Sequence, residues 1–210
     1  GAPGTTVRVS TLFGHVPARR KFLKSESAEA GRITELLETM ALAHPAVSFR
    51  LDHGPRRVLD LPAASNRRER VHALLGEELV PELLEVDARG GGGPSGVLAV
   101  WGVVARPSAS KPTGRHQRIY VNGRAIVDRS LLHAVKEAFR GVIDPARFPV
   151  AVIQLEVDPA EVDVNVHPAK SEVRFRQPSA VHSFLLRAVR SALRAADLVP
   201  LFSLDSPPGE

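Results

Sequence analysis

Val162-Asp163-Val164-Asn165-Val166-His167-Pro168-Ala169-Lys170 alternates valine with Asp, Asn or His as far as His167. Side chains of a strand point to opposite faces with a period of two, so this pattern predicts a strand with valines on the core and polar groups on the other face. Proline has no N–H to donate, and the strand is therefore expected to end before Pro168. Lys170 then follows on a loop, where its charge can contact something outside the domain.

The polar side chains of this strand could suggest a metal site, but their spacing argues against one. Asp163 and His167 are four residues apart, which is about 13 Å along an extended chain. Metal–ligand bonds are only about 2 Å long, so these two side chains cannot share an ion. We instead expect Asp163, Asn165 and His167 to form a hydrogen-bonded polar row that supports the strand.

The composition is that of a protein with a substantial core and an anionic partner. Of 210 residues, 43% are hydrophobic, and there is no cysteine, which excludes disulfides and thiolate metal sites. The 28 Lys and Arg residues against 23 Asp and Glu give a net charge of +5. Arginine predominates, which suits phosphate contacts but is equally explained by codon usage in a GC-rich genome. With no membrane-length apolar run and no signal peptide, we expect a soluble intracellular protein.

Local patterns predict alternating strands and helices around the opening segment. Further strands are expected over residues 5–12, 46–51, 56–61, 82–86, 97–104, 118–121, 124–127, 149–157 and 172–175. Helices are expected over residues 18–23, 26–43, 66–76, 129–140 and 178–196. The glycine-rich segment 89–96 is expected to be a flexible hairpin loop, because no helix follows it that would make it a phosphate-binding loop.

This order of elements predicts one α+β domain over residues 5–197. The expected architecture is a two-layer sandwich, with one mixed β-sheet and helices on one side of it. Residues 203–210 are expected to begin a linker.

Basic side chains form clusters that could contact an anion. Arg129 lies in the first turn of its expected helix, where free N–H groups favour negative charge. The clusters are Arg129, His133, Lys136 and Arg140; Arg187, Arg190 and Arg194; and Arg19, Arg20, Lys21 and Lys24. A solvated helix face commonly carries charge, so each cluster alone could be ordinary surface. Together they favour a surface that binds nucleic acid or phosphate.

The sequence contains no complete catalytic centre. There is no Walker A pattern, no zinc-binding H-E-x-x-H and no dinucleotide fingerprint. No Ser/His/Asp arrangement with a recognisable local signature is present either.

Three segments resemble the MutL family of DNA mismatch repair proteins, in order as well as in wording. They are 4–7 with 12–24; Tyr120-Val121-Asn122-Gly123-Arg124 with Asp128-Arg129; and 162–170 with Glu172-Val173-Arg174-Phe175. The resemblance spans residues 4–196 and is weakest between 45 and 115. His15 differs from the family, which usually has asparagine there.

The resemblance implies a transducer-like second domain, of the kind that follows an ATP-binding domain in MutL and gyrase B. Gly4 and Thr5 would belong to the end of the ATP lid within residues 1–15, and Lys170 would contact the γ-phosphate of ATP. Arg129 would line a DNA-binding groove, to which we assign the other basic residues of the two helices, Lys136, Arg140, Arg187, Arg190 and Arg194.

The resemblance also implies what the intact protein binds. We expect ATP and Mg²⁺ as its cofactors, none of them bound by this chain alone, because the chain would begin after the ATPase core and end before a C-terminal dimerisation domain. The expected activity is a DNA-stimulated ATPase of the intact protein. The expected partners are DNA, the mismatch-recognition protein MutS and a second copy, without a membrane, in the bacterial cytoplasm at the nucleoid.

Two other functions remain open from the sequence. One is a gyrase B-like transducer domain of a topoisomerase, although the wording of Pro17-Ala18-Arg19 favours MutL. The other is a nucleic-acid-binding module without a nucleotide, which would favour RNA over DNA and give Lys170 no role.

Overall fold

A five-stranded mixed sheet forms the centre of the molecule in the computed structural model, which describes residues 4–92, 96–163 and 173–198. In order across the sheet, the strands are β3 (Leu83–Gly92), β4 (Gly96–Ala105), β7 (Ala151–Val157), β5 (Gln117–Val121) and β6 (Arg124–Ile126). β3–β4 and β5–β6 are antiparallel hairpins. β7 lies between the two hairpins, antiparallel to β4 and parallel to β5.

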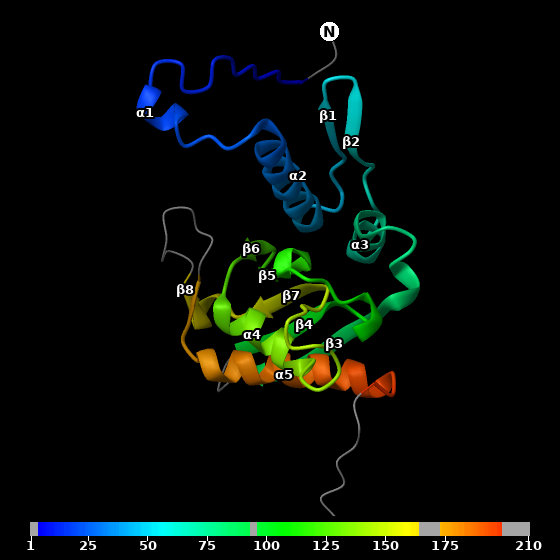
Figure 1. Cartoon of the computed structure of the whole chain (residues 1–210). Coiled ribbons are helices and arrows are strands. Elements are labelled where there is room, and N and C mark those ends of the chain that lie inside the picture. The colour runs from blue at the N-terminus through cyan, green and yellow to red at the C-terminus, as the bar shows by residue number, and fades with distance from the viewer. Residues whose placement is uncertain (1–3, 93–95, 164–172, 199–210) are drawn as a thin grey trace, which may run out of the picture.

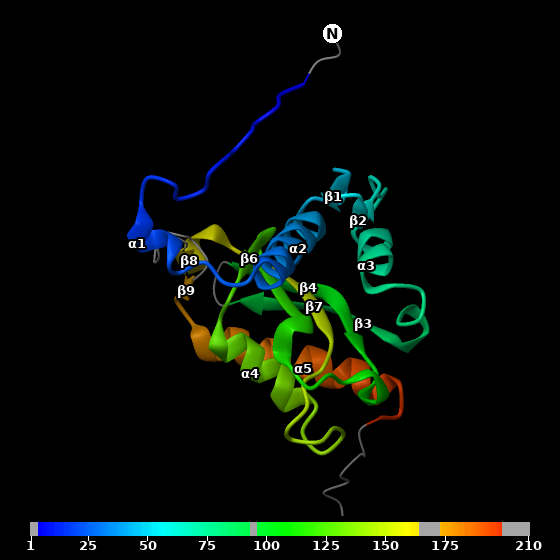
Figure 2. The same cartoon turned by 45° about the horizontal axis from the view of Figure 1, so that its top comes forward.

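Two helices cover one face of this sheet, α4 (Arg129–Ala138) and α5 (Pro178–Ala195). Alternate residues of β4 and β7, such as Val100 and Ile153, point toward these helices and are buried with Leu131 of α4 and Leu185 of α5. Both Figure 1 and Figure 2 place the two helices on the same side. The expected α+β class, the mixed sheet and this helical layer are confirmed.

The opposite face of the sheet is also covered in part, which corrects the expectation that helices lie on one side only. α2 (Glu26–Ala43) and α3 (Arg67–Leu75) lie above it with the hairpin of β1 (Phe49–His53) and β2 (Arg56–Leu61). Leu42 of α2 and Val71 of α3 form a second small core with Val103, Tyr120 and Val152. β4, β5 and β7 thus carry apolar side chains on both faces, and a sheet that is apolar on both faces needs a cover on each.

A close approach of β4 to β7 explains one glycine of the sheet. A Cβ built on Gly102 would lie 2.2 Å from the carbonyl oxygen of Val152. Any side chain there would force the two central strands apart, so only glycine fits this register.

Several local predictions are confirmed to within a few residues. α2 has the expected bounds, and the side chain of Asn66 accepts a hydrogen bond from the Glu69 N–H at 2.9 Å as the N-cap of α3. Asn122 and Gly123 both have positive φ, 50° and 77°, as a tight hairpin turn requires. A short helix, α1 (Pro17–Arg20), occupies the first part of the helix expected over 18–23.

The strand expected over residues 5–12 is not formed. Residues 4–10 carry no regular structure, and Val7 and Val9 are 81% and 74% exposed. A strand needs a neighbour to pair its backbone groups, and the segment before α1 runs clear of the sheet (Figure 2).

The apolar stripe of α2 also differs from a simple core-facing pattern. Ile33, Leu36 and Met40 are 49%, 59% and 43% exposed, whereas Ala41 and Leu42 are buried. α2 contacts the sheet through a different line of its surface, at Glu38, Thr39 and Leu42.

The glycine-rich loop is shorter than expected. β3 continues through Gly92, and Gly90, Gly91 and Gly92 pair with Leu98, Val97 and Gly96. Glycine lacks a preference for strand, but the long apolar β4 holds these residues in its ladder.

Candidate functional site

The segment that contains Lys170 is held at its two ends by a short antiparallel ladder. β8 (Val162–Asp163) pairs with β9 (Arg174–Phe175), so that Asp163 faces Arg174. Val173 and Phe175 are buried in the main core. The residues on the two sides of this segment are therefore paired with each other and anchored in the core.

An asparagine supports this place from the neighbouring hairpin. The Asn122 side-chain amide donates to the Val157 carbonyl and accepts from the Val157 N–H, both at 2.9 Å. The Asn122 N–H also donates to Leu155. The turn therefore fixes the chain where it leaves β7, shortly before β8.

Two arginines flank the base of the Lys170 segment. Arg174 and Arg176 are exposed, and with Asp163 they help line a cavity of about 290 Å³. The Arg176 N–H donates to the Glu161 carbonyl, which keeps this arginine beside β8. Guanidinium groups in such a position suit a phosphate.

The expected phosphate-contacting and supporting residues lie only in part within the described residues. Asn165, His167 and Lys170 lie outside the described residues, and Asp163 is exposed at the end of β8. Gly4 and Thr5 are exposed in the segment before α1. The assignments of these residues stay predictions.

The expected DNA-binding residues lie on α4 and α5, on the layer away from α2, except Arg140, which follows the end of α4 at Ala138. Arg129, Arg187 and Arg194 are exposed, and Arg190 is half-buried. Arg129 occupies the first turn of α4, whose N-cap Asp128 accepts from the Leu131 N–H at 2.9 Å. His182 of α5 touches α4, and Arg194 lies about 18 Å further along the α5 axis, at 1.5 Å per residue. The six residues therefore extend over two helices and the turn after α4 rather than forming one cluster.

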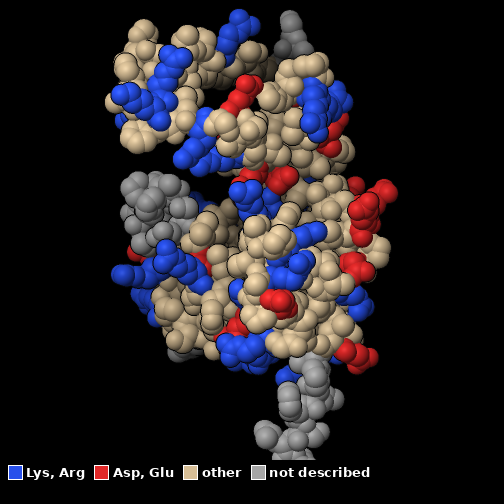
Figure 3. All heavy atoms as spheres, viewed as in Figure 1, with Lys and Arg blue, Asp and Glu red and all other residues tan. Residues whose placement is uncertain are grey.

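Two of the expected DNA-binding side chains already have internal partners. The Lys136 ammonium lies 4.2 Å from the centroid of the Phe148 ring. Arg140 contacts Glu137 across 3.8 Å. Among the described residues, no carboxylate lies within ion-pair distance of Arg129, Arg187, Arg190 or Arg194. Figure 3 shows basic patches separated by neutral and acidic side chains on the face it displays.

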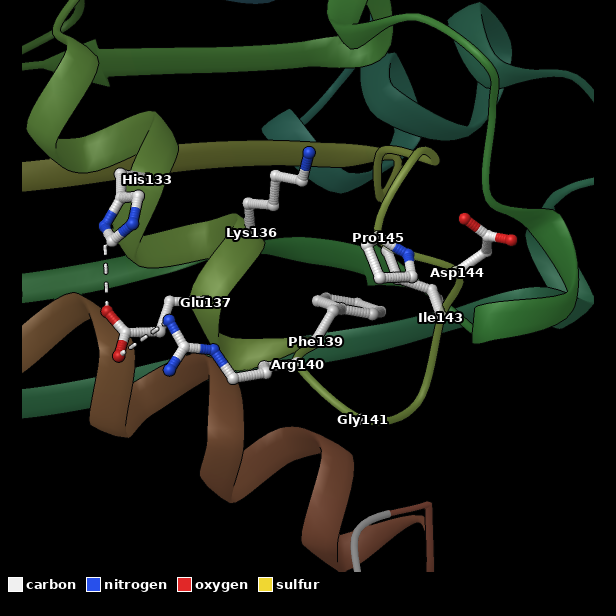
Figure 4. A pocket seen from close by; sticks show the side chains of 9 residues that line it. All are labelled: His133, Lys136, Glu137, Phe139, Arg140, Gly141, Ile143, Asp144 and Pro145. Carbon is white, nitrogen blue, oxygen red and sulfur yellow. Dashed lines mark ion pairs between the residues drawn. The ribbon is translucent and has the colours of Figure 1, made fainter.

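A compact group at the contact between α4 and α5 was missed by the sequence reasoning. Glu137 Oε2 lies 3.6 Å from His133 Nδ1 and 3.9 Å from His182 Nε2, and the two imidazole rings stack with centroids 5.8 Å apart. Figure 4 shows His133 and Arg140 approaching Glu137, while Lys136 points away. The spacing of His133 and Glu137, one helical turn, was a visible signal, but nothing local to His182 links it to them.

A hydrogen bond and an ion pair attach α2 to the sheet. The Tyr120 hydroxyl donates to the Thr39 carbonyl at 3.0 Å, and Arg118 pairs with Glu38. Burial raises the pKa of the Tyr120 phenol, which therefore stays protonated. Burial also lowers the pKa of Arg70, whose Nη2 donates to the carbonyls of Pro45 and Val47 at 2.8 and 2.6 Å.

None of the helices in the described part of the chain combines the length and the apolar composition that a membrane span requires.

Solved structures support this arrangement of elements. A crystal structure of the N-terminal domain of a DNA repair protein superposes with a TM-score of 0.75 over 90% of this chain and 61% of its own, at 21% identity, which supports the fold alone. The Aquifex aeolicus MutL ATPase domain complexed with ADP is 30% identical, with a TM-score of 0.52, over 72% of this chain and 52% of its own.

Sequence comparisons identify the family. A family model described as DNA mismatch repair protein, C-terminal domain, matches residues 71–194. DNA mismatch repair protein MutL of Xylella fastidiosa (strain 9a5c) is 46% identical over 193 residues, which is 91% of this chain and 30% of the relative. The chain thus spans about a third of the length of that relative. The resemblance drawn from the three motifs is confirmed, and the chain belongs to the MutL family of DNA mismatch repair proteins.

Proposed function

We propose that this chain is the transducer domain of an ATP-gated, DNA-binding clamp that acts in mismatch repair. The observation that carries the proposal is the likeness to the Aquifex aeolicus MutL ATPase domain, a relative that was solved with ADP. In the intact protein a separate domain would hold ATP and Mg²⁺, and this chain would respond to the nucleotide. Its partners would be DNA, MutS and a second copy of the protein.

Lys170 is the residue through which we expect the response. It lies in the segment between Asp163 and Arg174, two residues that face each other across the β8–β9 ladder. Gly4 and Thr5, at the end of the ATP lid, would meet the nucleotide from another side. A lysine is a compact, mobile point charge, and it suits an oxyanion whose charge changes on hydrolysis.

The arginines at the base of this segment fit a phosphate-bearing ligand. Arg174 and Arg176 are both exposed beside β8. When ATP is bound, its γ-phosphate supplies the negative charge that the ammonium of Lys170 would contact. Loss of that charge would release the lysine and loosen the attachment between the two domains.

DNA contact is assigned to α4 and α5. Arg129 would contact phosphate groups at the first turn of α4, where its guanidinium adds to the free N–H groups of the helix. Along α5, further phosphate contacts would come from Arg187, Arg190 and Arg194. Lys136 and Arg140 would contribute less to DNA binding because they have internal partners.

The test is ATP turnover of the intact protein with Lys170→Ala. We expect a loss of roughly 10²-fold, because removal of one charge-stabilising group in a water-excluded site costs that much. Lys111→Ala is the matched control, since Lys111 contacts Phe148 through its backbone and keeps that contact. Unchanged turnover in Lys170→Ala, with wild-type thermal stability, would refute the role of Lys170.

A further inference from the structure

The contact between α4 and α5 brings together three side chains that are all ligands for transition metals. His133 and Glu137 are one turn apart on α4, and His182 approaches them from the second turn of α5. Their ligand atoms all lie within 4.8 Å of one another. We propose that His133, Glu137 and His182 bind a divalent transition-metal ion, with Zn²⁺ as the ion that fits their chemistry.

The distances are close to those of a tetrahedral site. Bonds of about 2.0–2.1 Å place neighbouring ligand atoms of such an ion about 3.3 Å apart. Glu137 Oε2 is 3.6 Å from His133 Nδ1 and 3.9 Å from His182 Nε2. One carboxylate oxygen therefore already lies near both imidazoles, and only small side-chain rotations are needed to enclose an ion.

The three side chains differ in how firmly they are held. Glu137 and His182 are 23% and 21% exposed at the side chain, whereas His133 is 61% exposed. Two ligands are therefore positioned by the packing of α4 against α5, and the third can close over an ion from solvent. An entry path and a partly fixed site are both present.

Other contacts of the group leave its metal-facing atoms available. Arg140 lies 3.8 Å from Oε1 of Glu137, the oxygen that does not face the histidines. Neither histidine has a hydrogen bond at its ring nitrogens among the described residues, since both approaches to Glu137 exceed 3.5 Å. Arg140 can therefore orient the carboxylate while Oε2 binds the ion.

Two imidazoles and one carboxylate select the class of ion. Imidazole suits Zn²⁺, Cu²⁺, Ni²⁺ and Fe²⁺, whereas Mg²⁺ and Ca²⁺ prefer sites made of oxygen. Three protein ligands leave a tetrahedral Zn²⁺ one position for water. The cavity of about 380 Å³ beside the group, which is lined in part by His133, Glu137 and Phe139, gives that position room.

A bound ion would connect α4 to α5 near the N-terminal end of α5. The two helices otherwise meet through apolar residues such as Val135 and Leu185. Metal binding would therefore raise the stability of this layer, because a ligand that binds only the folded state stabilises it. This site depends neither on ATP nor on DNA.

The experiment is a titration of the untagged, chelator-treated 210-residue chain with Zn²⁺, followed by calorimetry. We expect one ion per chain and a rise in Tm on Zn²⁺ addition. Glu137→Gln and His133→Ala should each weaken binding by at least about tenfold, since loss of even an outer partner of a metal ligand costs roughly 10–100-fold. Co²⁺ in place of Zn²⁺ should give the visible absorption of a tetrahedral ion.

The matched control is His53→Ala, which removes a histidine that is 53% exposed and also pairs with a glutamate, Glu26, at 3.0 Å. It should leave Zn²⁺ affinity unchanged. His182→Gln, checked by circular dichroism, removes the third imidazole with little change in volume and should also weaken Zn²⁺ binding. Equal affinity in the wild type and the α4 variants, or an equal loss in His53→Ala, would overturn the proposal.

Discussion

At the scale of the residue, arginines of this chain fall into two groups. Arg50, Arg57, Arg67, Arg68 and Arg118 each pair with a carboxylate of the same chain. Arg129 and the three arginines of α5 have no such partner among the described residues. A neighbouring carboxylate cancels much of the positive potential of a guanidinium group. An exposed arginine without such a neighbour remains available to a phosphate.

Reversal of the charge at Arg129 should therefore weaken DNA binding by the intact protein. We expect Arg129→Glu to lower affinity and to reduce the slope of log affinity against log salt by about one, because each lost phosphate contact removes about one released counterion. Fluorescence anisotropy at several salt concentrations measures the slope. Arg32→Glu carries the same change of charge on α2, where Arg32 pairs with Glu29, and should leave the slope unchanged. Identical slopes for Arg129→Glu and the wild type would exclude a phosphate contact at Arg129.

At the scale of the element, α3 shows a helix whose start depends on one carboxylate. Glu69 Oε2 accepts from the Ser65 hydroxyl at 2.5 Å and from the Ser65 N–H at 2.7 Å, while its own N–H donates to Asn66. The Ser65 hydroxyl and N–H hold the pKa of Glu69 below its ordinary value of 4.5. The ionised form is thus favoured in the folded state.

The free energy of unfolding should therefore depend on pH through the ionisation of Glu69. A carboxyl whose pKa is lowered by folding contributes stability that is present above 4.5 and is lost as the pH falls through the lowered pKa. Urea unfolding of the wild type and Glu69→Gln should therefore differ most near neutral pH, and the difference should shrink on acidification. A constant difference across this range would mean that the Ser65 contacts do not depend on charge.

Helices and hairpins were predictable where the signal is local. The cap at Asn66, the Asn122–Gly123 turn and the bounds of α2 follow from neighbours within a few residues. The missing strand over 5–12 and the exposed stripe at Ile33, Leu36 and Met40 depend on what lies beside them in space, which periodicity does not report. The candidate site divides in the same way: Arg129 could be found on its helix, but His182 meets His133 only through the packing of α5 on α4.

At the scale of the whole molecule, the sheet lies between two layers, α4 with α5 on one face and α2 with α3 on the other, and these layers differ in how much contact they make with it. α4 and α5 share a large apolar core with it, whereas α2 is attached by Leu42, the Tyr120–Thr39 hydrogen bond and the Arg118–Glu38 pair. The layer that contains α2 should therefore unfold locally more readily than the layer of α4 and α5.

Tyr120→Phe tests this difference, because it removes one hydrogen bond and retains the buried ring. We expect a loss of about 1 kcal/mol in the free energy of unfolding, the usual net value of such a bond. In hydrogen exchange, amides of α2 should exchange faster in the variant while those of α5 keep their protection. Faster exchange in both helices would show that the two layers unfold together.

The position of β7 between the two hairpins also bears on how the chain is made. β3–β4 and β5–β6 can each form as soon as they leave the ribosome, but the 45 residues 106–150 separate β4 from β7. The ribosome adds roughly 5–20 residues per second, so β4 lacks its second neighbouring strand for about 2–10 s during synthesis. During that time the unpaired edge of β4, which is rich in apolar residues, is exposed to other unfolded chains. We therefore expect a chaperone to prevent aggregation most effectively in this interval.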